Sequence, residues 1–133
     1  MTATGAVDYA RLLGFRVALR QFLHWSEDQA KSVGLTPAQH QLLLCIRGSE
    51  GPADPAIGDV ADCLLLRHHS AVELVNRAEL GELVVRHSDP DDARVIRVRV
   101  TATAGRLLNK LTEAHLEELR RLSTMLRPMV GDT

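Results

Sequence analysis

The sequence has few aromatic residues, no excess of either charge and no long hydrophobic run. Phenylalanine, tryptophan and tyrosine make up only 3% of the 133 residues, so the core must be built mainly from Leu, Val, Ile and Ala. The formal net charge is −1, so any basic surface for nucleic acid has to be local. No apolar run approaches the ~18 residues of a membrane span. The N-terminus lacks a cationic segment followed by an apolar one, so we expect neither signal peptide nor membrane contact.

The two cysteines, Cys45 and Cys63, lie in apolar runs and lack the spacing of a metal site. Neither has a basic residue immediately beside it that would favour a reactive thiolate. We therefore expect both to be reduced and buried in a cytoplasmic protein. A redox switch is the alternative interpretation.

The signatures of catalysis and of cofactor binding are also missing. The sequence contains no glycine-rich phosphate loop, no metal-ligand spacing and no nucleophile elbow. His68 and His69 are adjacent, and adjacent side chains diverge by about 100° on a helix, which makes them poor joint ligands. The carboxylates of residues 89–92 fall on an exposed turn, with no burial to tune them as acid and base. We expect no enzyme, no cofactor and no metal.

Helical patterns cover the first half of the chain. Residues 8–32 form a long helical pattern whose apolar face is wide enough to contact a second subunit as well as its own domain. Thr36-Pro37 and Asp54-Pro55 each place a cap residue directly before a proline. Each pair predicts the start of a further, shorter helix.

A fourth helical pattern covers residues 67–80, between a break at residues 65–66 and Gly81. Small and branched apolar residues at helical spacing mark the side that packs against the domain. The opposite side is polar and carries Arg67, His68, His69, Ser70, Glu73, Asn76 and Arg77.

Two short stretches after this helix alternate between apolar and polar residues. Residues 83–87 and 95–100 predict two β-strands, joined by a turn with Asp89 in the first position and Pro90 in the second. Both arginines of the second strand lie opposite its apolar residues. We therefore expect a hairpin with one buried face and one solvent-exposed, cationic face.

The last helical pattern runs from Gly105 to about Arg127, where Pro128 disfavours continuation. Its apolar seam is long and narrow, which suits pairing with another helix. The seam consists of Leu108, Leu111, His115, Leu119, Leu122, Leu126 and Met129. His115 is expected to be a hydrogen-bonded interface residue, with pH sensing as the alternative.

This order of elements predicts a winged helix-turn-helix, a mainly α-helical fold with a small β-hairpin wing. A helix fits the major groove of double-stranded DNA, and an arginine near the tip of the hairpin can enter the adjacent minor groove. Arg94 is the candidate for that insertion, and Asp92 can hold it by a charge-assisted hydrogen bond. The alternative is a solvated ion pair that contributes little.

We expect DNA contacts from Arg67, His68, His69, Ser70, Glu73, Asn76, Arg77, Asp92 and Arg94. Arginines suit phosphates, side chains near the helix start can reach base edges, and Glu73 can accept from cytosine or orient an arginine. The alternative is the solvated face of an ordinary amphipathic helix. Residues 67–106 contain seven arginines and six acidic residues, so the prediction depends on where the acidic side chains point.

Four stretches of the sequence resemble successive motifs of one family. LTPAQHQLLLCI resembles a helix motif "L-T-x-x-Q…L-L", and IGDVADCL resembles "eLA…L". VNRAELGELVVR resembles "V-D-R-L-E…GLV-x-R", and DPDDARVIRVRV resembles the wing motif "D-P-x-D-x-R". The sequence is thus similar, over residues 35–105, to the MarR family of bacterial transcription regulators. It departs from the family in having Glu82 in place of the glycine before "LV", and about one extra residue between Arg94 and Gly105.

The resemblance implies a homodimer that binds an inverted repeat in double-stranded DNA. Residues 1–133 are then a single domain, with residues 8–32 and 106–128 as dimerisation helices and residues 36–105 as the winged lobe. It also implies repression that is released by a small lipophilic or phenolic effector bound between these regions. The candidate lining residues are His24, Trp25 and His40, for which partly buried packing is the alternative.

Two other functions are compatible with the sequence. One is a dimeric ligand-binding or protein-interaction module that keeps the winged-helix fold without binding DNA, which the near-neutral charge and Glu82 favour. The other is a small enzyme that uses a cleft between the helices.

Overall fold

The computed structural model describes residues 7–131, which form five helices and one antiparallel hairpin. The elements are α1 (Tyr9–Ser32), α2 (Pro37–Gly48), α3 (Ile57–Leu64), α4 (His68–Leu80), β1 (Val84–Ser88), β2 (Ile96–Val100) and α5 (Ala102–Val130). The predicted winged helix-turn-helix fold with long flanking helices is confirmed.

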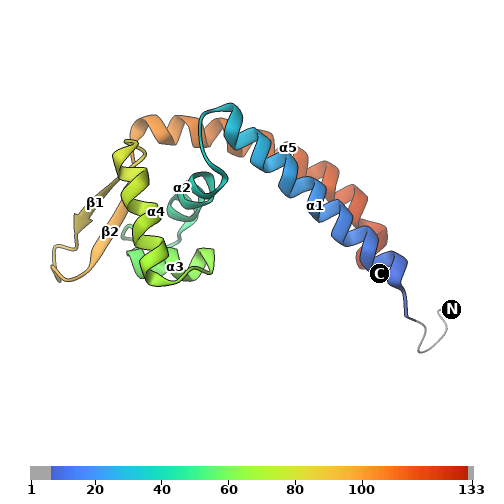
Figure 1. The fold of residues 1–133 in the computed structure, drawn as a ribbon, viewed down its shortest axis with the longest axis horizontal. Helices are drawn as coiled ribbons and strands as arrows, with labels where there is room; N and C mark the ends of the chain where they lie inside the picture. Colours follow the sequence, from blue (N-terminus) through green and yellow to red (C-terminus); the bar gives the residue numbers. More distant parts are fainter. Residues whose placement is uncertain (1–6, 132–133) are drawn as a thin grey trace.

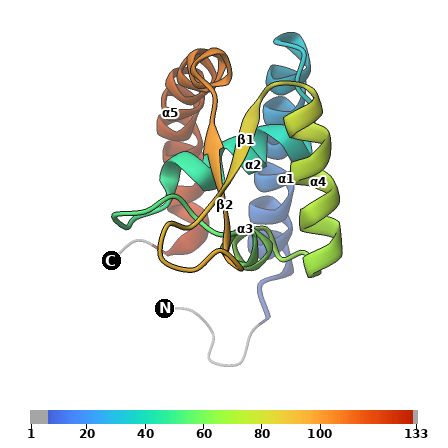
Figure 2. The same ribbon diagram turned by 90° about the vertical axis from the view of Figure 1, so that its left-hand side faces the viewer.

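The molecule consists of a lobe and a projecting arm (Figure 1). The lobe contains α2, α3, α4 and the hairpin, and the arm is formed by α1 and α5, which run antiparallel to each other and are in contact (Figures 1 and 2). The core lies in the lobe, where apolar residues of α2, α3 and α4 pack against the inner faces of β1 and β2. The first half of α5 adds Ala104, Leu108 and Leu111 to this core, which anchors the arm to the lobe. No helix of residues 7–131 is long and apolar enough to cross a membrane.

The start of α2 is as predicted. The hydroxyl of Thr36 accepts a hydrogen bond from the backbone amide of Gln39, and the Gln39 side chain accepts one from the amide of Thr36, both at 3.1 Å. Pro37 occupies the first helical position, where a missing amide proton costs nothing. This reciprocal capping satisfies two of the amide groups that a helix start leaves free.

The prediction that Asp54-Pro55 caps α3 is wrong. The capping contact comes from Asp59, whose carboxylate accepts from the backbone amide of Ala56 at 3.0 Å. Pro55 lies in an extended segment, and its carbonyl accepts from the amide of Val98 in β2 at 3.0 Å. Because this backbone pairs with the hairpin, the carboxylate of Asp54 is directed toward the hairpin and not toward α3.

The predicted start of the last helix is also wrong, since α5 begins at Ala102. The hydroxyl of Thr101 caps it by accepting from the backbone amide of Ala104 at 3.2 Å. Gly105 therefore lies inside the helix, where the side chain of Arg47 packs against it. A Cβ atom at Gly105 would lie 2.5 Å from Nη2 of Arg47, a contact that the exposed arginine side chain relieves by moving.

Pro128 does not end α5, which continues to Val130. A proline removes one backbone hydrogen bond, and the loss is tolerated in the last turn, where few hydrogen bonds remain to be made. The guanidinium of Arg11 in α1 donates to the carbonyl of Met129 at 2.5 Å. This contact satisfies a terminal carbonyl and ties the end of the arm together.

The hairpin pairs Val84 with Val100 and Ser88 with Ile96 at its two ends. The predicted turn at Asp89-Pro90 is displaced, because the backbone hydrogen bond that closes the tip runs from the amide of Val95 to the carbonyl of Asp92, at 2.9 Å. The Asp89 carboxylate accepts instead from the amides of residues 91 and 92, at 2.8 and 3.1 Å. An aspartate side chain thus replaces a backbone carbonyl in shaping the bend.

The connection between α4 and β1 explains the departure at Glu82. Its φ is +59°, a left-handed conformation that glycine adopts without steric cost. Gly81, one residue earlier, has an ordinary φ of −84°. The family motif places glycine where the backbone requires it, and this chain has glycine one position too early.

Candidate nucleic-acid interface

The polar side of α4 is largely open to solvent. Arg67, His68, His69, Glu73 and Arg77 are exposed, and α4 lies along one edge of the lobe (Figure 2). Its inner side is closed by fully buried small and branched residues, Ala71, Val75 and Ala78. The helix therefore presents the predicted polar residues on a rigid, well-packed support.

Two of the expected contact residues on α4 are less accessible than the sequence suggested. Ser70 and Asn76 are half-buried. The side-chain oxygen of Asn76 is buried without a hydrogen-bond partner among the described residues. Because this atom faces inward, any contact of Asn76 with a ligand would have to come from its amide nitrogen or follow a change of rotamer.

The tip of the hairpin holds Arg94 in a defined orientation. The guanidinium donates to both carboxylate oxygens of Asp92, at 3.1 and 3.2 Å, while the side chain of Arg94 remains 91% exposed. The hydrogen bonds from the Arg94 side chain and backbone lower the pKa of the Asp92 carboxyl. The predicted pairing of these two residues is confirmed, and it leaves one face of the guanidinium free.

The remaining charges of the hairpin are largely neutralised within the lobe. Asp54 accepts from His87 at 2.9 Å and from Arg99 at 3.0 Å, and its backbone carbonyl accepts from Arg97 at 2.7 Å. Arg97 also pairs with Asp89 at 2.6 Å and is only 23% exposed. Burial alone would raise the pKa of Asp54, but the hydrogen bonds from His87 and Arg99 outweigh it and lower this pKa. The predicted solvent-exposed, cationic face is therefore present only in part: Arg99 is 62% exposed but paired, and Arg97 is largely covered.

These ion pairs determine which basic side chains remain unpaired and free to contact a ligand. Arg86 in β1 pairs with Glu79 of α4 at 2.9 Å, so one more arginine and one more acidic residue neutralise each other. Arg67 and Arg77 form no ion pair within residues 7–131. Arg67 and Arg77 are thus unpaired among the described residues, and three of the six acidic residues of the segment are paired with arginines.

The three expected effector-pocket residues do not line one cleft within this chain. His24 is exposed and, with Trp25, borders an open groove of about 500 Å³ along α1. His40 is only 3% exposed and lines a separate pocket of about 200 Å³ beside Ser26. The predicted shared cleft is wrong for the described chain, because His40 lies on α2 and faces a different pocket from His24 and Trp25 on α1.

His115 lies at the seam between α1 and α5, as predicted, and its ring also contacts His40 of the lobe. Its Nε2 lies 2.7 Å from the hydroxyl of Ser26 in α1, and its Nδ1 lies 2.6 Å from the carbonyl of Leu111. Its ring centroid is 4.9 Å from that of His40 and 4.8 Å from that of Trp25. Burial, and then the proximity of His115, lower the pKa of His40. Helical periodicity placed His115 on the right face of its helix but carried no information about these partners.

Comparison with known proteins agrees with the fold and the motifs. The sequence profile of the MarR family matches residues 33–95, from the end of α1 to the tip of the hairpin. The matched segment, just under half of the chain, is thus similar to the MarR family. The uncharacterized HTH-type transcriptional regulator YsmB of Bacillus subtilis is 30% identical over 67 residues, which are 50% of this chain and 46% of YsmB. The chain thus matches about half the length of this relative.

Solved structures of this family share the fold over most of both chains. A variant of MepR from S. aureus, bound to an oligodeoxyribonucleotide, matches with a TM-score of 0.69 and 18% identity, over 90% of this chain and 84% of that one. Wild-type MarR from E. coli in its apo form matches with a TM-score of 0.70 and 17% identity, over 90% and 85% of the two chains. At this identity the similarity establishes the architecture of the MarR-family lobe and arm.

The two cysteines of the chain have different environments. Cys45 is buried, as expected, but Cys63 is exposed. The inward face of the short helix α3 is taken by Ile57, Val60 and Ala61, which leaves Cys63 on its outer side. Within residues 7–131 no group of three or more His, Cys, Asp or Glu side chains is placed to hold a metal ion.

Proposed function

We propose that this protein is a transcription regulator that binds double-stranded DNA with α4 and the tip of its hairpin. The observation that carries the proposal is the orientation of Arg94, which is held by Asp92 and yet almost fully exposed. A guanidinium held in this way loses little conformational freedom when it enters a minor groove, whose negative potential attracts it. The same fold in MepR from S. aureus, bound to an oligodeoxyribonucleotide, supports the proposal.

We assign different roles to the polar side chains of α4 and to the arginines beside them. Side chains at the start of the helix, from His68 to Ser70, reach base edges in the major groove. Arg67 and Arg77 have no competing acidic partner among the described residues and contact phosphates. Glu73 lies on the same exposed side and accepts from cytosine or orients an arginine. Asn76 contributes only if its half-buried side chain turns outward.

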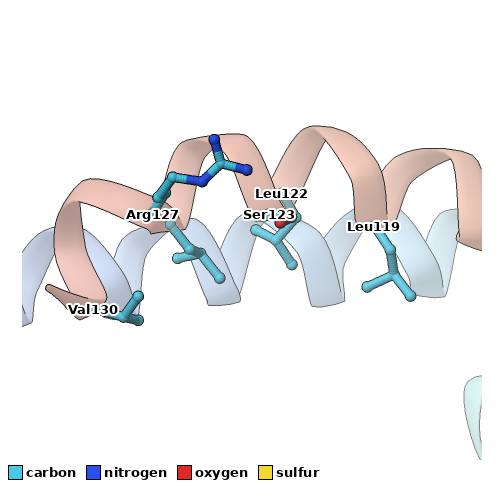
Figure 3. A pocket seen from close by; sticks show the side chains of 6 residues that line it. Leu119, Leu122, Ser123, Arg127 and Val130 are labelled. Atoms are coloured by element: carbon cyan, nitrogen blue, oxygen red, sulfur yellow. The ribbon is translucent and has the colours of Figure 1, made fainter. Parts of the chain in front are cut away.

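We propose further that the protein acts as a homodimer through its arm. Apolar side chains that one chain leaves uncovered include Leu12 and Leu13, which are 63% and 62% exposed, and Tyr9. On α5 the side chains of Leu119, Leu122 and Val130 border an uncovered groove of about 400 Å³ (Figure 3). Exposed apolar patches of this extent mark interaction surfaces, and a two-fold axis through the arm places two lobes on an inverted repeat.

Within this proposal, residues 36–105 form the DNA-binding lobe and residues 8–32 and 106–128 form the dimerisation helices. The regulator acts as a repressor, and a small lipophilic or phenolic effector releases it from DNA. The apolar groove beside His24 and Trp25 lies on α1 and is the candidate effector site. Binding there changes the distance between the two lobes and so their fit to half-sites about one helical turn apart.

The experiment is fluorescence anisotropy with the full-length protein and DNA from upstream of its own gene, compared with scrambled DNA across a salt series. We expect selective binding that weakens steeply with salt, because phosphate contacts release counterions. Equal, weak binding to both DNAs is followed by selection from random DNA. Absence of any selected sequence would instead favour a dimeric ligand-binding or protein-interaction module, an alternative that the neutralised charges of Arg97 and Arg99 favour.

A further inference from the structure

Cys45 of α2 and Cys63 of α3 form a thiol pair at the junction of the two helices. Cys63 is close enough to Cys45 to contribute to its raised pKa. Both border an open pocket of about 290 Å³ on the outer side of the lobe, which is also lined by Gln41, Leu44, Gly48, Ser49 and Leu64. The helices themselves are held in place by the core, so the pair is positioned before any ligand arrives.

The two thiols differ in their surroundings. Cys45 is 8% exposed, and Cys63 is open to solvent. Burial, followed by the hydrogen bond with Cys63 and the nearby charge of Asp59, raises the pKa of Cys45 to about 12. At neutral pH such a thiol is almost never ionised, so reactions that need a thiolate at Cys45 are slow. Two thiols that line one pocket offer a site for a reagent that condenses with a pair of thiols.

We propose that Cys45 and Cys63 together bind trivalent arsenicals as a chelating dithiol. An organic arsenous oxide condenses with both thiols: two arsenic–sulfur bonds form, the arsenic–oxygen bond breaks, and the oxygen leaves as water with both thiol protons. Arsenic remains trivalent, and no oxidant or reductant is consumed. Its third substituent faces the pocket, where apolar Leu44 and Leu64 accommodate an organic group.

Both cysteines together, and not either one alone, allow the site to retain an arsenical in the presence of monothiols. After the exposed Cys63 has reacted, the thiol of Cys45 is already adjacent, so closure of the chelate is intramolecular and has a high effective concentration. A free monothiol such as glutathione displaces a single arsenic–sulfur bond but competes poorly with the chelate. The bridge also links α2 to α3, which stabilises the folded state because the unfolded chain does not hold the two thiols together.

The probe is phenylarsine oxide, added to the full-length native protein in a large excess of glutathione and followed by mass spectrometry and thermal unfolding. We expect one equivalent bound, retained against glutathione and released by the dithiol dithiothreitol. We expect the midpoint of thermal unfolding to rise by several degrees. Cys63→Ser, a change at an exposed position, is expected to lose both the retention and the thermal shift, and Cys45→Ala is expected to behave in the same way.

Several results would overturn the proposal. They are loss of the adduct to glutathione, binding of two equivalents, or equal retention by Cys63→Ser. A fall in the midpoint of thermal unfolding would show that the arsenical binds the unfolded chain more tightly than the folded protein. That result would exclude a preformed site. If Cys45→Ala does not fold, as judged by circular dichroism, Cys63→Ser decides the question alone. The proposal does not depend on DNA binding, so it stands or falls separately from the proposed function.

Discussion

Asp54 and Arg99 connect the extended segment before α3 to the second strand of the hairpin, with 3.0 Å between the carboxylate and the guanidinium. The same carboxylate oxygen accepts from His87 in the first strand at 2.9 Å. One aspartate therefore ties both strands of the hairpin to the chain that leads into the helix-turn-helix. The relative position of the hairpin and α4, on which the proposed DNA contacts depend, rests in part on this side chain.

The first prediction concerns Asp54→Asn, which removes the charge but keeps the size of the side chain. We expect the free energy of unfolding to fall by about 1–2 kcal/mol at pH 7, because Arg99 and His87 lose an anionic, half-buried hydrogen-bond acceptor. The folded state lowers the pKa of this carboxyl, so its contribution is present above the ordinary value of 3.8 and is lost as pH falls through the lower folded value. The difference between wild type and variant in urea unfolding is therefore expected to shrink below about pH 4.

Asp91→Asn is the matched control, since Asp91 is exposed on the same hairpin. It is expected to change stability by less than about 0.5 kcal/mol. An Asp54→Asn variant as stable as wild type at pH 7 would show that solvent replaces the hydrogen bonds of Asp54 without loss.

The second prediction concerns the left-handed residue Glu82. Glu82→Gly is expected to raise the free energy of unfolding by about 1 kcal/mol, because a side chain at φ +59° is strained and glycine is not. Gly81→Ala is the companion change: its φ is ordinary and an added Cβ meets no atom closer than 3.6 Å, so it is expected to be neutral or slightly stabilising. Urea unfolding measures both, and a destabilised Glu82→Gly variant would contradict the steric explanation.

The third prediction concerns the tip of the hairpin. Arg94→Ala is expected to weaken DNA binding and to reduce the slope of log affinity against log salt by about one unit, because one phosphate-region contact is lost. Asp92→Ala keeps the cation but releases its orientation, so a smaller loss is expected. Arg120→Ala, an exposed arginine on α5, is the control in the same anisotropy assay. Equal slopes for wild type and Arg94→Ala would remove Arg94 from the interface.

The fourth prediction concerns the arm. Leu12→Asp is expected to convert the proposed dimer into a monomer, because it places a charge in an apolar interface. The control is Leu65→Asn, at a 92% exposed position of the lobe whose φ of 57° suits asparagine. Light scattering after size-exclusion chromatography measures the mass of each. A wild-type protein that is monomeric at micromolar concentration would contradict the dimer itself.

Much of the fold could be predicted from local patterns. Thr36 and Pro37 determine where α2 begins, since capping and the fixed φ of proline act within a few residues. Helical and alternating periodicity located α1, α4 and both strands to within one or two residues. The pairing of Arg94 with Asp92 was also predictable, since it joins residues two positions apart.

The wrong predictions have a common cause. In each case a residue that fits a local sequence pattern contacts a segment far away in the sequence instead. Asp54-Pro55 has the pattern of a helix cap. The Pro55 carbonyl accepts from Val98 of β2 instead, and the Asp54 carboxylate accepts from Arg99 of the same strand. Gly105 has the pattern of a helix boundary, but it lies inside α5, beside the side chain of Arg47. Similarly, no spacing in the sequence indicates that Cys45 and Cys63 meet.

The sequence by itself determined the order of the elements, the polar side of α4 and the composition of the hairpin tip. Those features depend on backbone propensity and on side chains that share one helix or strand, which are interactions of short range. Only the tertiary structure decided which arginines remain free and which histidines and thiols are neighbours. Ion pairs form, and the two thiols become neighbours, through contacts between segments far apart in the chain. Such contacts exist only after the helices have packed around the core.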